Sequence, residues 1–176
     1  MADWSQGYET GIDYIPHYCR ELNPLWPRLA LLHRGLLPPP GRVACELGYG
    51  QGLSVVLHAA ASGGEWWGTD FNPAQAAFAQ HLAAVAGARA SLFDQPFAEF
   101  CQRPDLPDFA FIGLHGIWSW VSDQNRALIV DFVRRRLKPG GVLFISYNSQ
   151  PCWAALVPLR QLLLDHTRTL SPPGLG

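Results

Sequence analysis

The sequence has no excess of either charge, since its 176 residues include 13 Lys and Arg against 14 Asp and Glu, for a net charge of -1. Proteins that bind a phosphate backbone need clustered Lys and Arg, so this balance does not favour nucleic acid as a partner. Charged residues make up 15 % of the chain and hydrophobic residues 48 %, which is a globular composition. A chain of this length predicts one ordinary domain with a sizeable buried core.

Paired metal ligands and membrane-directing segments are also missing. Four scattered cysteines, Cys19, Cys45, Cys101 and Cys152, form no C-x-x-C pair, which argues against a zinc knuckle or a disulfide framework and indicates a reducing compartment. The six histidines show no paired spacing either, so we expect no metal site. The opening MADWSQGYET lacks a basic region followed by an apolar run, and no long apolar span occurs. We therefore expect a cytoplasmic protein without a membrane partner.

What the chain does have is a regular alternation of β-rich runs and helical patterns. The expected strands cover 42–47, 65–70, 90–93, 109–114 and 142–147. The expected helices cover 25–37, about 52–62, 73–86, 95–102, 123–137 and 153–166. This alternation requires right-handed crossovers, and it predicts an α/β fold with a Rossmann-like parallel sheet of about five strands and helices on both faces.

Local signals predict where several elements begin and end. The prolines from Pro38 to Pro40 are expected to end the first helix, because proline lacks an N–H and fixes φ. Asn72 before Pro73 is typical of an N-cap, and Asp123 is the expected N-cap of the helix over 123–137. We divide the chain into three parts, namely an N-terminal helical or lid segment over 1–40, a ligand-binding domain over 41–166 and a flexible tail over 167–176.

Polar side chains follow the expected strands at their carboxyl ends, where sheets of this kind bind ligands. The residues at these ends are Glu46 before a run of glycines, Asp70-Phe71-Asn72, Asp94-Gln95, His115, and Ser146-Tyr147-Asn148. The sequence therefore predicts a ligand site at this edge of the sheet.

The glycine run ELGYGQG differs from the fingerprint of a dinucleotide site. Counting from Gly48 and Gly50, the third small residue of G-x-G-x-x-G is replaced by Leu53. The carboxylate of Glu46 just ahead would also repel a pyrophosphate. A cationic or zwitterionic nucleoside fits better, with its amino-acid part over the glycine backbone, its ribose hydroxyls on Asp70 and its adenine amino group near Asp94.

This pattern resembles the class I S-adenosylmethionine-dependent methyltransferases, whose first motif is an acidic residue followed by G-x-G-x-G at the end of the first strand. The resemblance covers about 42–147 and implies S-adenosylmethionine as the cofactor, with Asp70 as the ribose-binding acid and Asp94-Gln95 at the adenine. The implied cofactor-binding residues are Glu46, Gly48, Tyr49, Gly50, Gly52, Asp70, Phe71, Asn72, Asp94, Gln95 and His115.

A narrower resemblance is to a bacterial group in which the methyltransferase domain precedes a methyltransferase regulatory domain, and in which some relatives methylate protein lysines. It rests on TDFNP at 69–73, LHGIWSWV at 114–121, LKPGG at 137–141 and SYN at 146–148, with Pro-x-Trp at 151–153. The sequence departs from the group at Cys152, where a glycine is expected, and it stops before any regulatory domain. The resemblance implies methyl transfer to a protein side chain or a small molecule.

Transfer of a sulfonium methyl depends chiefly on placing the nucleophile in line with the breaking bond. An amine nucleophile must also lose a proton, and the candidate proton acceptors or orienting groups are His115, Tyr147 and Tyr14. Structural alternatives stay open: His115 as an ordinary structural histidine, Asp70 and Asp94 as helix caps, and Tyr8, Tyr14 and Tyr18 as residues that pack on the sheet or form a lid over the cofactor.

Two other functions stay open as well. One is a cofactor-binding module without activity of its own, and the other, disfavoured by Leu53, is a nicotinamide-dependent oxidoreductase. The antiparallel hairpin that usually ends a class I sheet has no place after 166, because the remaining residues include Pro172 and Pro173. We therefore expect five strands, with the edge of the fifth covered in a longer protein or in a homodimer.

Overall fold

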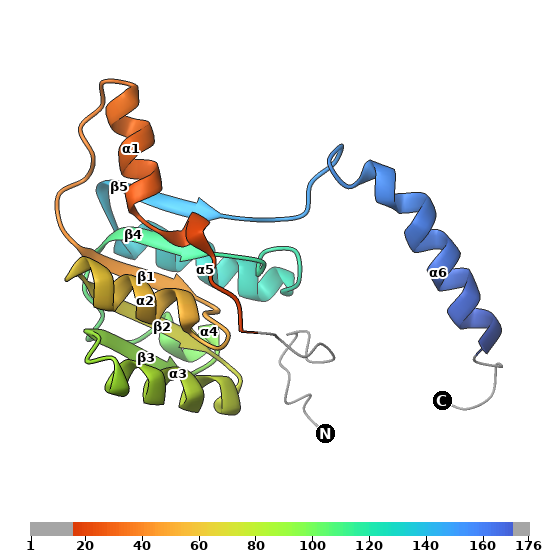
Figure 1. Cartoon of the computed structure of the whole chain (residues 1–176), viewed down its shortest axis with the longest axis horizontal. Helices are drawn as coiled ribbons and strands as arrows, with labels where there is room; N and C mark the ends of the chain where they lie inside the picture. The colour runs from red at the N-terminus through yellow and green to blue at the C-terminus, as the bar shows by residue number, and fades with distance from the viewer. Residues whose placement is uncertain (1–15, 171–176) are drawn as a thin grey trace. The chain divides into compact units, whose positions relative to one another are not determined.

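The computed structural model describes residues 16–170 (Figure 1). They belong to two compact units, 16–146 and 147–170. Tyr14, one of the predicted catalytic residues, lies outside the described residues.

Five parallel strands form the central layer of the first unit, in the order β3-β2-β1-β4-β5 (Figure 1). They are β1 (Val43–Leu47), β2 (Glu65–Asp70), β3 (Ala90–Asp94), β4 (Phe109–Leu114) and β5 (Leu137–Ile145). Because β1 pairs with β2 on one side and with β4 on the other, the strand order reverses between β1 and β4. The predicted α/β fold with a five-stranded parallel sheet is confirmed, and residues 16–170 contain no antiparallel hairpin.

Helices cover both faces of the sheet. They are α2 (Leu53–Ser62) and α3 (Pro73–Val85) on one face, and α4 (Phe97–Phe100) and α5 (Asp123–Arg136) on the other. Ala44 packs with α2 and α3, whereas its neighbour Cys45 packs with α4 and α5. Successive residues of a strand point to opposite faces, so each strand supplies two apolar clusters. The helices expected on both faces are thus confirmed.

The first helix ends earlier than predicted. A short 3-10 turn, η1 (Arg20–Leu22), precedes α1 (Leu25–His33). Gly35 follows the helix with a φ of 71°, and the Leu36 N–H donates to the Leu31 carbonyl at 2.9 Å. This is a glycine stop, so Gly35 ends the helix ahead of the prolines. The α1 helix buries none of its residues.

Three further boundaries differ from those that the sequence predicts. Ser122, and not Asp123, caps α5, because its backbone is extended and its side chain accepts the Asn125 N–H. The fifth strand starts at Leu137, earlier than the expected residue 142, so Pro139 lies inside it. The pairing of β4 with β5 shifts register there, between Phe109 and Phe111 of β4. The α4 helix is also shorter than the expected 95–102. In contrast, the predicted cap of α3 is confirmed, since the Asn72 side chain accepts the N–H groups of Ala74 and Gln75.

The open edges of the sheet belong to β3 and β5. Within the described residues, β5 pairs with β4 alone, so the homodimer or longer chain expected to cover its other edge stays a prediction. The second unit holds η2 (Ala154–Leu156) and α6 (Val157–Leu170). None of the described helices is long and apolar enough to cross a membrane.

Candidate functional site

A pocket of about 350 Å³ lies at the carboxyl ends of β1, β2 and β4, next to the point where the strand order reverses. Its wall includes residues 48–54 after β1, residues 70–72 at the end of β2 and residues 115–117 after β4. The other lining residues are Glu46, Gln75, Phe97, Trp120 and Val121, together with His17, Cys19 and Leu22. A pocket at this place in an open α/β sheet is where small ligands bind.

The three glycines after β1, Gly48, Gly50 and Gly52, all have positive φ values, of 69°, 57° and 72°. The space around a Cβ atom at each position is different, however. A Cβ at Gly48 would collide with Ile117, and a Cβ at Gly52 would collide with Ala79. At Gly50, the nearest atom to such a Cβ would be the Gln75 side chain, at 3.8 Å. Gly48 and Gly52 are therefore needed for close packing, and only Gly50 leaves open space beside the pocket.

Asp70, at the end of β2, ties the glycine loop to the next strand. Its Oδ2 accepts the Gly50 N–H at 2.8 Å, and its Oδ1 accepts the Asn72 N–H at 3.0 Å. Burial raises the pKa of Asp70 to about 6, although these hydrogen bonds act in the opposite direction. Each carboxylate oxygen can accept a further hydrogen bond, so the ribose contact stays a prediction that this geometry permits.

Glu46 is the second buried acid of the pocket, with 4 % of its surface exposed. Its Oε2 has no hydrogen-bond partner among the described residues, and no cationic side chain in 16–170 forms an ion pair with Glu46 or Asp70. Burial and the Asp70 carboxylate raise the pKa of Glu46 to about 8. Two buried acids without a positive partner favour binding of a cation.

Tyr49 and Phe71 also contribute to the wall. The Tyr49 side chain is buried, and its hydroxyl donates to the Phe93 carbonyl at 2.9 Å. Burial raises the pKa of Tyr49 well above its ordinary value. The Tyr49 ring therefore belongs to the core, where it joins the glycine loop to β3.

His115 lies on the wall at the end of β4. Its Nδ1 is 3.0 Å from Ser146 Oγ, which also accepts the Gly116 N–H at 2.8 Å. Burial lowers the pKa of His115, while the nearby Glu21 carboxylate raises it and His17 lowers it further. Burial therefore favours the neutral imidazole, and the contact with Ser146 orients the ring.

The other predicted residues are not part of this wall. Asp94 lies opposite Asp70 in the pairing of β3 with β2 and is exposed, and the Gln95 N–H donates to the Asp70 carbonyl at 3.1 Å. Their contact with an adenine stays a prediction, as does the role of Tyr147, an exposed residue of the second unit. Within residues 16–170, no group of three or more His, Cys, Asp or Glu side chains is arranged to hold a metal ion.

Sequence reasoning missed the wall formed by His17, Cys19 and Leu22. Leu22 is 1 % exposed, and a Cβ at Gly113 of β4 would lie 2.7 Å from its Cδ2. A glycine in the middle of an apolar strand is a signal of such a close approach. That signal does not identify the segment that approaches.

Comparisons of the sequence give relatives without an assigned activity. No family model matches the chain. An uncharacterized protein of Synechocystis, sll1526, is 39 % identical over 178 residues, which cover 98 % of this chain and 35 % of that protein. The uncharacterized protein RP028 of Rickettsia prowazekii is 33 % identical over 63 residues, or 36 % of this chain and 25 % of that protein. The chain thus spans about a third of the Synechocystis relative.

Comparisons of the structure identify the fold. PKMT2 from Rickettsia typhi, solved in complex with AdoHcy, matches 92 % of this chain and 32 % of its own with a TM-score of 0.78 at 22 % identity. A SAM-dependent methyltransferase from Geobacter sulfurreducens, in complex with S-adenosyl-L-homocysteine, matches 88 % of this chain and 66 % of its own with a TM-score of 0.54 at 19 % identity. The chain therefore has the fold of the class I S-adenosylmethionine-dependent methyltransferases.

Proposed function

We propose that the chain binds S-adenosylmethionine in this pocket and takes part in methyl transfer to a protein side chain or a small molecule. The observation that carries the proposal is the pair of buried acids, Glu46 and Asp70, beside the open space at Gly50. The cofactor bears a sulfonium and an ammonium group, which would compensate the charge of Asp70 and favour the ionised form of Glu46. Its ammonium could donate to Glu46 Oε2, which has no partner among the described residues.

The bound cofactor would supply an activated methyl group on a positively charged sulfur. The chain would position it, because in-line placement contributes ~7–11 kcal/mol in well-oriented reactions. His115 can act as a proton acceptor at Nε2 when its Nδ1–H donates to Ser146. Ser146 Oγ has two lone pairs, so it can accept both this N–H and that of Gly116.

Calorimetric titration with S-adenosylhomocysteine tests the proposal, with NAD as the comparison ligand. We expect saturable binding of the first ligand and no binding of the second. Gly50→Val should abolish binding, because its side chain would enter the pocket. Gly87→Val is the matched control, since Gly87 has nearly the same φ of 58° and nothing within 4 Å of a Cβ. Equal loss of affinity in both variants, or no binding by the unmodified chain, contradicts the proposal.

A second candidate is cofactor binding without transfer by this chain alone. It is favoured by one observation, that the chain spans 35 % of the Synechocystis relative and 32 % of PKMT2. Release of S-adenosylhomocysteine during incubation with S-adenosylmethionine and candidate protein or small-molecule acceptors distinguishes the two. Turnover supports transfer, whereas tight binding without turnover supports the second candidate.

A further inference from the structure

The segment from His17 to Leu22 forms a wall of the pocket, and we call it the N-terminal wall. Cys19 and Leu22 are 4 % and 1 % exposed, and both line the pocket. Leu22 lies over Gly113 of β4, so the wall covers the sheet where the strand order reverses. The wall is therefore packed against the scaffold and does not project into solvent.

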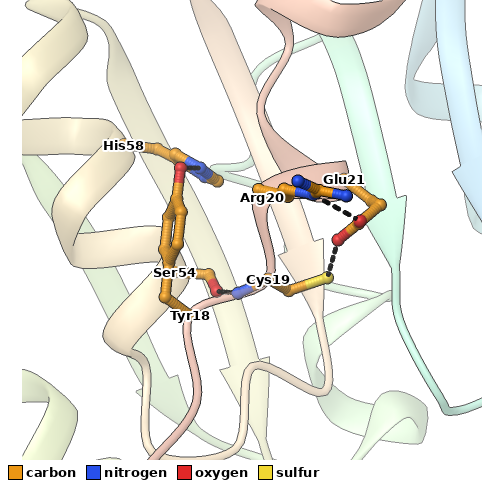
Figure 2. Close-up of polar contacts among 6 residues, drawn as sticks. All are labelled: Tyr18, Cys19, Arg20, Glu21, Ser54 and His58. Carbon is orange, nitrogen blue, oxygen red and sulfur yellow. Dashed lines mark hydrogen bonds and ion pairs between the residues drawn. The ribbon is translucent and has the colours of Figure 1, made fainter.

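Two side chains of α2 hold the N-terminal wall in place (Figure 2). The Cys19 N–H donates to Ser54 Oγ at 2.7 Å. The Tyr18 hydroxyl lies 3.2 Å from His58 Nε2, and the two rings meet edge to face with centroids 5.4 Å apart. Cys19 and Ser54 are 4 % and 5 % exposed, so water competes little for the first contact. In the second contact His58 is buried, whereas Tyr18 is 38 % exposed.

The same helix also follows the glycine loop. Its first residue is Leu53, directly after Gly52, and Ser54 itself lines the pocket. The Ser54 hydroxyl thus connects the loop expected under the cofactor to a segment 35 residues earlier in the chain. Any displacement of the N-terminal wall relative to the glycine loop breaks this hydrogen bond.

The N-terminal wall also carries charged groups toward the end of β4. Glu21 Oε2 accepts a hydrogen bond from the Cys19 thiol at 3.5 Å, and its Oε1 accepts from Arg20 Nε at 3.0 Å. Figure 2 shows Arg20 and Cys19 on the two sides of this carboxylate. Burial lowers the pKa of His115 most, while Glu21 raises it and His17 lowers it further, so the wall contributes to the electrostatic environment of the candidate proton acceptor.

We propose that Ser54 is a positioning residue that fixes the N-terminal wall against the cofactor pocket, with the Tyr18–His58 contact as a second attachment. The inference rests on the proposed function for the identity of the ligand. Without the Ser54 hydroxyl, the Cys19 N–H loses its acceptor and the wall separates from the glycine loop. The pocket then opens to water beside Glu46, and the cofactor loses one side of its enclosure.

Hydrogen exchange and calorimetry on Ser54→Ala test the proposal. Ser62→Ala is the matched control, because Ser62 lies at the other end of α2 and outside the pocket wall. We expect exchange over 16–22 to become more than tenfold faster in Ser54→Ala and to stay unchanged in Ser62→Ala. Affinity for S-adenosylhomocysteine should fall five- to twentyfold only in Ser54→Ala, and Ser54→Thr, which keeps the hydroxyl, should restore most of it.

Unchanged exchange over 16–22 in Ser54→Ala overturns the inference, and so does an affinity within twofold of the unmodified chain. If Ser54→Ala does not fold, Tyr18→Phe serves as the test, because it removes only one hydroxyl from a residue that is 38 % exposed. It should speed exchange over 16–22 and weaken binding about threefold. If Tyr18→Phe changes neither the exchange over 16–22 nor the affinity for S-adenosylhomocysteine, the proposal is wrong. If the unmodified chain does not bind S-adenosylhomocysteine, the proposed function fails, while the exchange rates of the free chain still test the attachment.

Discussion

The two sides of the pocket are built in different ways. The glycine-loop side, residues 46–53 and 70–72, lies at the ends of two neighbouring strands, and hydrogen bonds to β2 hold it, from the Gly48 N–H to the Thr69 carbonyl and from the Gly50 N–H to the Asp70 side chain. The N-terminal wall is held by side chains of α2, namely Ser54 and His58. The first side therefore depends on the pairing of the adjacent strands β1 and β2, and the second depends on contacts between α2 and a segment that lies outside the sheet. Variants on the two sides should accordingly affect stability and ligand binding differently.

The largest effect is expected from Gly52→Val on the glycine-loop side. The new side chain would collide with Ala79 on α3, at a position with a φ of 72°. Overpacking and positive-φ strain together should lower the free energy of unfolding by about 3 kcal/mol. Urea denaturation measures this loss. Gly87→Val, which has the strain without the collision, should lose about 1 kcal/mol, and an equal loss in both would show that packing against Ala79 is unimportant.

Asp70→Ala should act on binding as well as on the loop. It removes the acceptor of the Gly50 and Asn72 N–H groups and the predicted ribose acceptor. Affinity for S-adenosylhomocysteine should fall by about 2 kcal/mol, as measured by calorimetry. Asp108→Ala, at the opposite end of the sheet before β4, is the control and should bind normally. A loss of stability with unchanged affinity would leave Asp70 with a structural role only.

The third prediction concerns pH and Glu46. In the folded chain, the pKa of Glu46 is raised from 4.5 to about 8. Between pH 4.5 and pH 8, Glu46 is therefore protonated in the folded chain and ionised in the unfolded chain. Stability from this group is therefore present below pH 4.5 and is lost as the pH rises toward 8. In Glu46→Gln, the decline in the free energy of unfolding over this pH range should be smaller by on the order of 1–2 kcal/mol. The difference is smaller than the full pKa shift implies, because the structure relaxes around a buried acid. Unfolding free energies at pH 5, 6, 7 and 8 measure it, and parallel profiles for the two proteins would contradict the raised pKa.

The smallest effect on binding is expected at His115, on the exposed rim. His115→Gln should change the affinity for S-adenosylhomocysteine by less than about 0.5 kcal/mol, because surface substitutions away from packed features have small effects. Transfer to an amine acceptor should fall much more if His115 accepts the proton. Comparing the affinity with the rate of S-adenosylhomocysteine formation measures the difference. A large loss of affinity would instead place His115 in cofactor binding.

Much of the fold could be predicted because its signals are local. Strands buried on both faces appear as continuous apolar runs, such as that of β4, and the Asn72-Pro73 pair marks the start of α3. Element ends were less predictable, as Gly35 and Ser122 show, because several neighbouring residues can serve as a stop or a cap. Which residue does so depends on the backbone angles that packing imposes on each.

For the pocket, the sequence by itself determined the glycine loop, Glu46 and Asp70, because all three lie at the carboxyl ends of β1 and β2, which meet at one edge of a parallel sheet. Only the tertiary structure decided which segment forms the N-terminal wall, and which of the three glycines pack against neighbouring side chains. Gly52 is required by Ala79, and Cys19 is held by Ser54, 35 residues away. Such contacts have no periodicity or local propensity, since they exist only once helices and strands pack, and a single sequence therefore cannot reveal them.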